Sequence, residues 1–267
     1  MTTTLGLLLA TLIGVSLGLL GGGGAILAVP IFTYVMGFGA KEAIASSLVV
    51  VGVTSLFGTA EHWREGHVRL RTALIFGVFA MVGAYLGAQL ATLFSDAAQL
   101  ILFAVVMLVA VFFMFRDNNK EESDEYEGGS GTEDFSVAGV SLGCAAGLTM
   151  LGVAIGVLTG LVGVGGGFLI VPALVLFGEL PVKDAVGSSV LVIAMNSASG
   201  FVGYIGKVEI QWGIIVLFTV LAVAGSFAGT YLVRFVPANA LQKAFAVFLV
   251  AMAIFILYEN RQAIPLV

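Results

Sequence analysis

The sequence predicts an all-α protein that crosses a membrane several times. Hydrophobic residues make up 60% of the 267-residue chain and charged residues only 10%, whereas a soluble domain carries about 25% charged residues. Long segments contain no Lys, Arg, Asp or Glu, and a membrane-spanning helix needs about 20 apolar residues. These uncharged segments are 1–40, 43–60, 72–95, 97–115, 135–178, 185–206, 210–233 and 244–258. A soluble fold is therefore excluded, and any binding site must lie within the bilayer or at its faces.

Two glycine-rich segments interrupt the longest uncharged stretches, 142 residues apart. One starts at Gly21 and ends in Val29-Pro30, and the other starts at Gly163 and ends in Val171-Pro172. Glycine supports a helix weakly, and a bilayer tolerates broken backbone only where protein buries it or a watery cavity receives it. Interrupted apolar segments at matching positions in two halves are the best sequence indication of a transporter's substrate site.

The two halves of the chain are repeats of each other. Aligned at an offset of 142, residues 14–58 and 156–200 are identical at 17 of 45 positions, including Gly, Pro, Lys and a Ser-Ser pair. We therefore predict a first transmembrane repeat at 1–115 and a second at 136–260. The segment 116–135 carries eight of the sixteen acidic residues. We interpret it as a flexible, solvated linker loop.

Each repeat is predicted to contain a glycine-broken helix or re-entrant hairpin, followed by three spanning helices. In the first repeat, helices are expected at 5–20, 25–36, 42–60, 72–94 and 97–115. In the second, they are expected at 138–162, 167–178, 184–205, 210–233 and 238–258. The second segment of each set is too short to cross a bilayer comfortably. Each glycine break therefore makes either a re-entrant hairpin or one kinked crossing.

The distribution of Lys and Arg favours the hairpin. If each break returns the chain to its starting side, the second repeat is inverted, and eight basic residues face one side against three on the other. If each break is a single crossing, the division is seven against four. By this margin of one residue we predict inverted repeats, with the acidic loop in the cytoplasm and both termini outside.

Glycine pairs four residues apart occur at matching positions late in each repeat. Gly83 and Gly87 correspond to Gly225 and Gly229. This spacing of small residues lets helices pack closely.

The glycine breaks are the first candidate for binding a substrate. A broken helix frees main-chain N–H groups, and the positive end of the short helix after it binds anions without a cationic side chain. The alternative is a tight kink where another helix crosses. Neither run continues into the Gly-Lys-Ser/Thr ending of a phosphate-binding loop. The candidate residues are Gly22, Gly23, Gly24, Gly165, Gly166 and Gly167.

Polar side chains within the predicted spans are the second candidate. Their hydroxyls and amides could donate hydrogen bonds to an anion in a cavity, or could instead join helices to one another. Asn196 stands out, because a buried amide has more hydrogen bonds to satisfy. The candidates are Ser46, Ser47, Thr54, Ser188, Ser189 and Asn196.

The end of one span, Glu61 to His67, contains two further candidates. His62 could relay a proton, and Arg64 could attract an anion at the mouth of a cavity. The alternative is an ordinary interfacial loop with Trp63 in the aromatic belt. The charges of Lys41-Glu42 and Lys183-Asp184 are expected to face solvent at helix starts.

No paired-carboxylate site, metal-ligand cluster or Ser-His-Asp arrangement can be assembled from the sequence. We therefore predict that the protein is not an enzyme and uses no cofactor or metal. Its expected partners are the lipid bilayer and a small anion, not a nucleic acid, and the sequence leaves a homo-oligomer open.

The combined pattern resembles the TauE/SafE sulfite exporter family, also called the 4-toluene sulfonate uptake permease family. The glycine break followed by Val-Pro occurs in both halves, a Ser-Ser-bearing helix follows, and His62 to Val68 is similar to the family's His-x-x-x-Gly-x-Val turn. The second half departs from this turn, because Tyr204 to Val208 has no histidine. A symmetric role for His62 is therefore not expected.

The resemblance implies a multi-pass transporter in the cytoplasmic membrane of a bacterium or archaeon. Family members are associated with sulfite, sulfonates such as sulfoacetate, and related small sulfur-containing anions. We therefore expect a secondary transporter, an exporter, that holds its anion at the paired glycine breaks and works by alternating access. The alternatives are an anion channel, or a non-transporting membrane scaffold or assembly protein.

Overall fold

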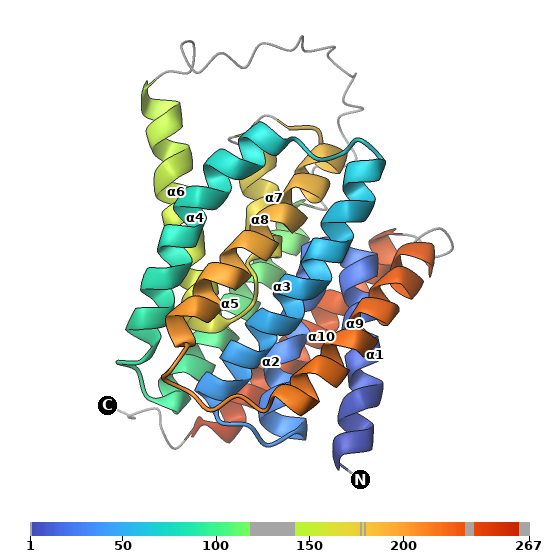
Figure 1. Ribbon diagram of the computed structural model, residues 1–267, viewed down its shortest axis with the longest axis vertical. Coiled ribbons are helices and arrows are strands. Elements are labelled where there is room, and N and C mark those ends of the chain that lie inside the picture. Colours follow the sequence, from blue (N-terminus) through green and yellow to red (C-terminus); the bar gives the residue numbers. More distant parts are fainter. Residues whose placement is uncertain (1, 118–141, 177, 179, 233–237, 262–267) are drawn as a thin grey trace.

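The protein is entirely helical over the residues that the structure describes. The computed structural model describes residues 2–117, 142–176, 178, 180–232 and 238–261, and its long helices form one bundle (Figure 1). This confirms the predicted all-α fold. The predicted linker lies outside these residues, apart from its first two positions. The long helices are α1 Thr2–Leu20, α3 Ala40–Arg64, α4 Leu70–Ala91, α5 Asp96–Asp117, α6 Leu142–Val162, α8 Val182–Tyr204, α9 Trp212–Leu232 and α10 Ala238–Glu259.

Several helices are suited to a bilayer by length and by surface. Within the described residues, four apolar helices are long enough to cross a membrane: Ala40–Arg64, Leu70–Ala91, Lys183–Tyr204 and Trp212–Leu232. Large apolar side chains on the outside of the bundle, such as Leu56, Val78, Val220 and Val247, are more than half exposed. Apolar surface of this extent is unfavourable in water but suits contact with lipid.

At the first glycine run the α-helix α1 ends and the chain continues as other kinds of helical turn. Gly21–Leu27 forms a 3-10 helix, η1, which leads into the three-residue α2, Ala28–Pro30, and a π-helical turn, η2, Ile31–Val35. Pro30 has no N–H to donate, so regular α-helical bonding is interrupted there. A short apolar helical segment, Gly24–Val35, is therefore present where one was expected at 25–36, and it combines three kinds of helical turn.

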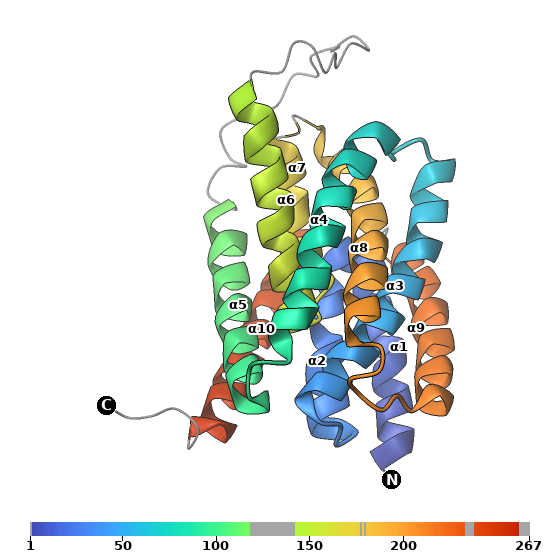
Figure 2. The same cartoon turned by 60° about the vertical axis from the view of Figure 1, so that its left-hand side comes forward.

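The second glycine run ends a helix fully. It separates α6 from α7, Gly167–Leu176, which contains Pro172. Figure 2 shows α7 returning beside α6 toward the end of the bundle at which α6 began. In the first half, Gly24 similarly lies against Ser16 and Leu17 of the preceding helix. The chain therefore reverses its direction at both breaks.

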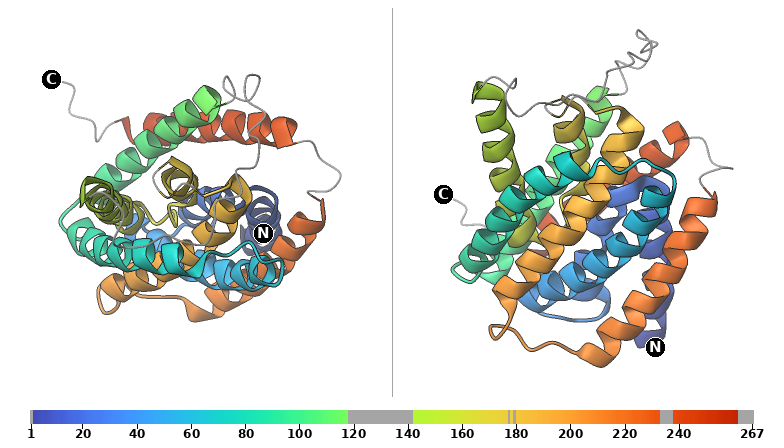
Figure 3. Two further views of the ribbon diagram at one scale, coloured as in Figure 1. Left: turned by 90° about the horizontal axis from the view of Figure 1, so that it is seen from above. Right: turned by 45° about the horizontal axis from the view of Figure 1, so that its top comes forward.

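The two halves pack mainly against each other. Helix α1 lies along α9, α6 lies along α4, α3 crosses α8, and α5 packs against α10. Figure 3 shows α7 inside the bundle, with α5 and α10 on one side and α3 and α8 on the other. Helices α3 and α8 are counterparts in the two predicted repeats, and so are α5 and α10. The other two pairs are equivalent to each other, because α1 packs against α9, the counterpart of α4, and α6, the counterpart of α1, packs against α4.

Glycines allow these helix pairs to approach closely. A Cβ atom added at Gly83 or Gly87 of α4 would overlap the main chain of α6, and one at Gly225 or Gly229 of α9 would overlap that of α1. The close packing expected from this spacing is therefore present. The facing helices contribute glycines of their own, whose Cβ atoms would overlap α9 or α4 in turn: Gly14, Gly18, Gly156 and Gly160.

Helices α3 and α8 cross in opposite directions. Near one end of the bundle, Glu42 at the start of α3 accepts a hydrogen bond from Gln211, which follows α8. Near the other end, Arg69, which follows α3, binds Asp184 at the start of α8. Residues in the middle of the two helices therefore face each other at the centre of the bundle.

Candidate functional site

The second glycine break has a backbone that only glycine adopts easily. Gly163, Gly165 and Gly166 have φ angles of 76°, 70° and 74°, in the left-handed region that side-chain-bearing residues disfavour. The N–H of Gly163 donates to Thr159 at the end of α6, and the oxygen of Gly166 accepts from Leu169 and Ile170 in α7. The N–H groups of Leu169 and Ile170 are thus already bonded, whereas the first N–H groups of a helix have no acceptor within it. The N–H groups that precede Leu169 are therefore the ones that could meet an anion, as the sequence predicts for this break.

This break is enclosed by the crossing helices α3 and α8. The hydroxyl of Ser47 donates to the oxygen of Gly163 over 2.8 Å. A Cβ at Gly165 would lie 2.8 Å from Val51 of α3 and 2.9 Å from Ile193 of α8. The break is therefore fixed between one helix from each half, close to the middle of the bundle.

The first glycine run lies beside the second but differs from it in conformation. A Cβ at Gly165 would lie 3.7 Å from Ala25, which follows Gly24 directly. The described glycines with positive φ do not include any of residues 21–24. The short helical segment after this run contains only three α-helical residues, those of α2. The two breaks are thus neighbours, but the second alone has an open, left-handed loop.

About one helical turn beyond Val51 and Ile193, which contact the second break, buried polar side chains have no hydrogen-bond partner. Asn196 is 0% exposed, and neither its amide nitrogen nor its amide oxygen is bonded. Ser55 and Ser197 are 2% and 0% exposed, and their hydroxyls are likewise unbonded. Buried polar groups are normally hydrogen-bonded. Unpartnered groups beside an irregular loop therefore mark a candidate ligand site.

Most of the other predicted side chains are already engaged. The hydroxyl of Thr54 donates to Val50, and that of Ser189 donates to Val186, each on its own helix. Ser188 accepts a hydrogen bond from the N–H of Arg69. Only Ser46 resembles Asn196 in being buried with an unpartnered polar atom.

The structure also separates the predicted Ser-Ser pairs. Because α3 and α8 run in opposite directions, Ser46 and Ser47 lie toward the end of the bundle marked by Glu42, whereas Ser188 and Ser189 lie toward the end marked by Arg69. The pairs therefore flank the centre from opposite sides. The residues that meet at the centre come from the Thr54-Ser55 and Asn196-Ser197 positions, where Gly52 faces Ser197.

The two candidate gating residues lie at the Arg69 end of the bundle. His62 packs next to Gly187 of α8, and its Nδ1 lies 3.7 Å from the Glu65 carboxylate. Arg64 is exposed at the last position of α3. Both residues are remote from the central polar side chains, because His62 and Arg64 lie seven and nine residues after Ser55 along α3.

Asp184 corrects one expectation from the sequence. It does not face solvent: it is 7% exposed, and its carboxylate lies 2.7 Å from Nε of Arg69 and 3.1 Å from Nδ1 of His67. Sequence spacing could not reveal this contact, because the partners are more than 110 residues apart. Over the described part of the chain, no three His, Cys, Asp or Glu residues are grouped to hold a metal ion.

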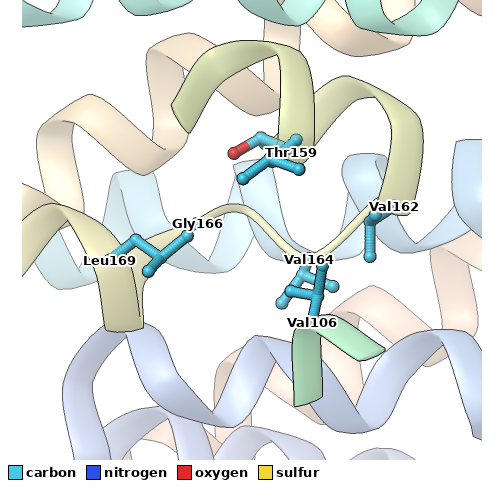
Figure 4. Close-up of a pocket in the computed structure, with 7 residues that line it drawn as sticks. Val106, Thr159, Val162, Val164, Gly166 and Leu169 are labelled. Atoms are coloured by element: carbon cyan, nitrogen blue, oxygen red, sulfur yellow. The ribbon is translucent and has the colours of Figure 1, made fainter. Parts of the chain in front are cut away.

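A small hollow lies on the other side of the second break. Val106 of α5 and Thr159, Val162, Val164, Gly166 and Leu169 surround it (Figure 4). The hydroxyl of Thr159 donates to Ile155 within α6. The lining is otherwise apolar, so this hollow is a poorer match for an anion than the polar side of the break.

Comparison with known proteins identifies the family to which this architecture belongs. Residues 6–256 match the family described as Sulfite exporter TauE/SafE. The chain belongs to the TauE/SafE family. The resemblance inferred from the repeated glycine motifs is thereby confirmed, and it covers nearly the whole chain. No solved structure matches the chain.

Relatives of this TauE/SafE protein occur in bacteria and in an archaeon. A "Probable membrane transporter protein" of Xylella fastidiosa (strain Temecula1 / ATCC 700964) is 32% identical over 252 residues, covering 93% of this chain and 92% of the relative. "Probable membrane transporter protein YdhB" of Bacillus subtilis (strain 168) is 28% identical, covering 89% and 93%. "Probable membrane transporter protein MJ0441" of Methanocaldococcus jannaschii is 28% identical over 200 residues, covering 73% and 69%. The protein is a membrane transporter.

Proposed function

We propose that this TauE/SafE protein is a secondary transporter that exports small sulfur-containing anions, such as sulfite or organosulfonates including sulfoacetate, across the cytoplasmic membrane. The observation that carries the proposal is the second glycine break, held between α3 and α8 at Ile193, about one helical turn before the unpartnered amide of Asn196. The anion accepts hydrogen bonds from main-chain N–H groups near Gly22–Gly24 and Gly165–Gly167 and from this amide.

The chemistry of the centre favours an anion over a cation. Helix α3 has no charged residue between Glu42 and Glu61, and α8 has none between Asp184 and its end at Tyr204. The groups present are hydroxyls, an amide and the N-terminal end of α7. Such neutral donors and helix ends bind oxyanions, whereas a cation site needs carboxylates or a ring of carbonyl oxygens.

The arrangement of the halves supports alternating access. Corresponding helices pack across the interface between the halves, and α3 and α8 cross in opposite directions. In transporters built from inverted repeats, one repeat rocks against the other around a site near the membrane centre. An anion channel would instead need a continuous polar pathway, and the hollow beside the second break is lined by apolar groups.

Flux into proteoliposomes tests this function. Purified protein is reconstituted, and uptake of sulfite, ethanesulfonate, sulfoacetate and sulfate is measured with and without a proton gradient. We expect saturable flux of at least one sulfur-containing anion. Asn196→Ala should lower that flux at least tenfold, whereas Ser226→Ala should leave it unchanged, because the Ser226 hydroxyl donates to Val223 within α9.

Three results would count against the proposal or a part of it. Absence of flux for all four anions, in protein that remains folded, would support the scaffold alternative. Flux that rises linearly with concentration and ignores every gradient would support a channel. Equal flux in wild type and Asn196→Ala would show that the Asn196 amide does not bind the anion.

A further inference from the structure

We propose that Ser55 of α3 and Ser197 of α8 form a pair of hydroxyl donors that hold the transported anion between the two halves. This inference rests on the proposed function and adds two substrate contacts to it. The serines are 142 residues apart, which is the offset of the repeats, so they are corresponding residues. Neither belongs to the set of site residues predicted from the sequence.

The helix crossing brings the two serines to the same region. Gly52 lies one turn before Ser55, and a Cβ at Gly52 would lie 3.1 Å from Cβ of Ser197. The absence of a side chain at Gly52 therefore lets α8 approach α3 at the turn that carries Ser197. The second glycine break contacts Val51 and Ile193, each of which precedes one of the serines by a single helical turn.

The hydroxyls of these serines differ from other hydroxyls in the bundle. Thr54, Thr59, Thr159 and Thr219 each donate to the carbonyl oxygen four residues earlier in their own helix. Ser55 and Ser197 make no such bond although both are buried. Each therefore retains a free donor next to the break, and an oxyanion supplies the acceptor.

An unpartnered buried hydroxyl destabilises a protein that has no ligand. Replacing either serine by alanine should therefore leave the melting temperature of the ligand-free protein unchanged or raise it. The same replacement should weaken substrate binding. A purely structural serine would show the opposite pattern, with lower stability and unchanged binding.

The experiment compares Ser55→Ala, Ser197→Ala and the double variant of the full chain with wild type, and uses Ser226→Ala as the matched control. Ethanesulfonate and sulfite are the probes, and both flux and thermal unfolding in detergent are measured. We expect each single variant to raise KM at least threefold and the double variant at least tenfold. The double variant should also lose the rise in melting temperature that ligand gives the wild type. The control should match the wild type in all three measurements.

The outcomes separate the pair from the proposed function. If the wild type carries an anion and the serine variants match it in KM, the pair is overturned while the proposed function stands. Lower ligand-free melting temperatures in both single variants would also overturn it, because the hydroxyls would then be structural. If the wild type is neither stabilised by the probes nor carries them, the proposed function fails, and the pair fails with it.

The geometry points to a second feature, carried by different residues: two unequal clasps join the ends of α3 and α8. The arginine clasp consists of Arg69, His67 and Asp184, and the glutamine clasp consists of Glu42 and Gln211. The repeat offset relates Glu42 to Asp184 and Arg69 to Gln211. The two clasps are therefore equivalent contacts in the two repeats. The arginine clasp contains an ion pair, whereas the glutamine clasp joins a carboxylate to a neutral amide.

The arginine clasp is the stronger of the two. Asp184 lies 2.7 Å from Nε of Arg69 and 3.1 Å from Nδ1 of His67, and the N–H of Arg69 donates to Ser188. In the glutamine clasp, one bond of 3.1 Å joins Nε2 of Gln211 to Glu42. Exposure of Arg69 weakens the attraction, but the buried Asp184 carboxylate would lose its charge partner if this end opened. The conformation closed at the arginine clasp is therefore favoured, and the opposite end opens more readily.

Labelling of cysteines at the two ends tests this bias. Ser188→Cys reports on the arginine clasp and Ser46→Cys on the glutamine clasp, each in a Cys144→Ala background in detergent with a water-soluble maleimide. Asp184→Asn should speed labelling of Ser188→Cys at least threefold and slow that of Ser46→Cys. Gln211→Arg should slow labelling of Ser46→Cys, because it gives Glu42 an arginine partner. Glu65→Gln, which removes a carboxylate at the arginine end outside the clasp, should change neither rate. Unchanged rates in Asp184→Asn, or an equal increase at both ends, would overturn the inference.

Discussion

The hydroxyl of Ser47 donates a hydrogen bond over 2.8 Å to the main-chain oxygen of Gly163, which lies 116 residues later in the chain. Its one proton is shared with the main-chain oxygen of Ile44 in its own helix, 2.7 Å away. The contact joins α3 of the first half to the glycine break of the second. Ser47 therefore fixes the break in place, which is a different task from the substrate contact that its position in the sequence suggested.

Replacement of Ser47 by alanine should destabilise the protein. The change leaves the oxygen of Gly163 without this donor, and loss of one partner from a buried hydrogen bond costs about 1–3 kcal/mol. Ser189 is the corresponding residue in the other repeat, and its hydroxyl donates only to Val186. Thermal unfolding in detergent should show a clear decrease for Ser47→Ala and a smaller one for Ser189→Ala. Equal decreases would show that the contact with the break contributes nothing.

A side chain at Gly165 should be far more harmful than one at Gly206. Both residues have left-handed backbone, with φ angles of 70° and 77°, so alanine strains either position by roughly 1–2 kcal/mol. At Gly165 the new methyl group would also press on Val51 and Ile193, whereas at Gly206 no atom lies within 4 Å. Gly165→Ala should therefore unfold at a markedly lower temperature than Gly206→Ala, and it should reduce flux. Equal stability of the two variants would mean that the break is loosely packed.

The glycines between α1 and α9 should be essential for folding. A Cβ at Gly14 or Gly18 would overlap main-chain atoms of α9, which cannot move aside as a flexible side chain can. Gly213 of α9 differs from them, because no neighbouring residue lies within 4 Å of its Cβ position. Alanine in an exposed helix is favoured over glycine by up to about 1 kcal/mol. Gly14→Ala should therefore sharply reduce the yield of folded protein, and Gly213→Ala should not. Size-exclusion profiles of the purified variants provide the comparison.

Two exposed carboxylates should lie on opposite faces of the membrane. Glu65 is at the end of the bundle that carries Arg69, and Glu209 is at the end that carries Gln211. The excess of basic residues predicts that the Glu65 end faces the cytoplasm. With Cys144→Ala as background, an impermeant maleimide applied to intact cells should label Glu209→Cys and spare Glu65→Cys. Labelling of both or of Glu65→Cys alone would contradict this orientation.

Much of the fold could be predicted from local chemistry. Uncharged apolar segments located the long helices to within a few residues at most ends, because a bilayer imposes both length and composition on a spanning helix. The first glycine run was harder to predict. Four consecutive glycines indicated a broken helix, yet Gly21–Leu27 remains wound as a 3-10 helix, because its neighbours and Pro30 decide which helical turn the backbone adopts.

The candidate site was predicted only in part. Asn196 was selected as a buried amide, and the fold leaves both of its polar side-chain atoms unpartnered. Ser55 and Ser197 were recognised as the neighbours of Thr54 and Asn196 and as an identical pair in the repeat alignment, but they were left out of the final set of predicted site residues. Residue type alone does not show whether a serine hydroxyl donates to its own helix or lacks a partner, so the sequence could not distinguish these serines from the others.

The sequence by itself determined that this chain is an all-helical membrane protein with two related halves, each interrupted by glycine, and that it is similar to the TauE/SafE family. These properties follow from composition, length and spacing, which act locally along the chain. The tertiary structure alone decided that α3 and α8 cross at Gly52 and Ser197, that Ser47 binds the second break, and that Asp184 is buried against Arg69. Those contacts join residues more than 110 positions apart, so only the packing of one half against the other could establish them.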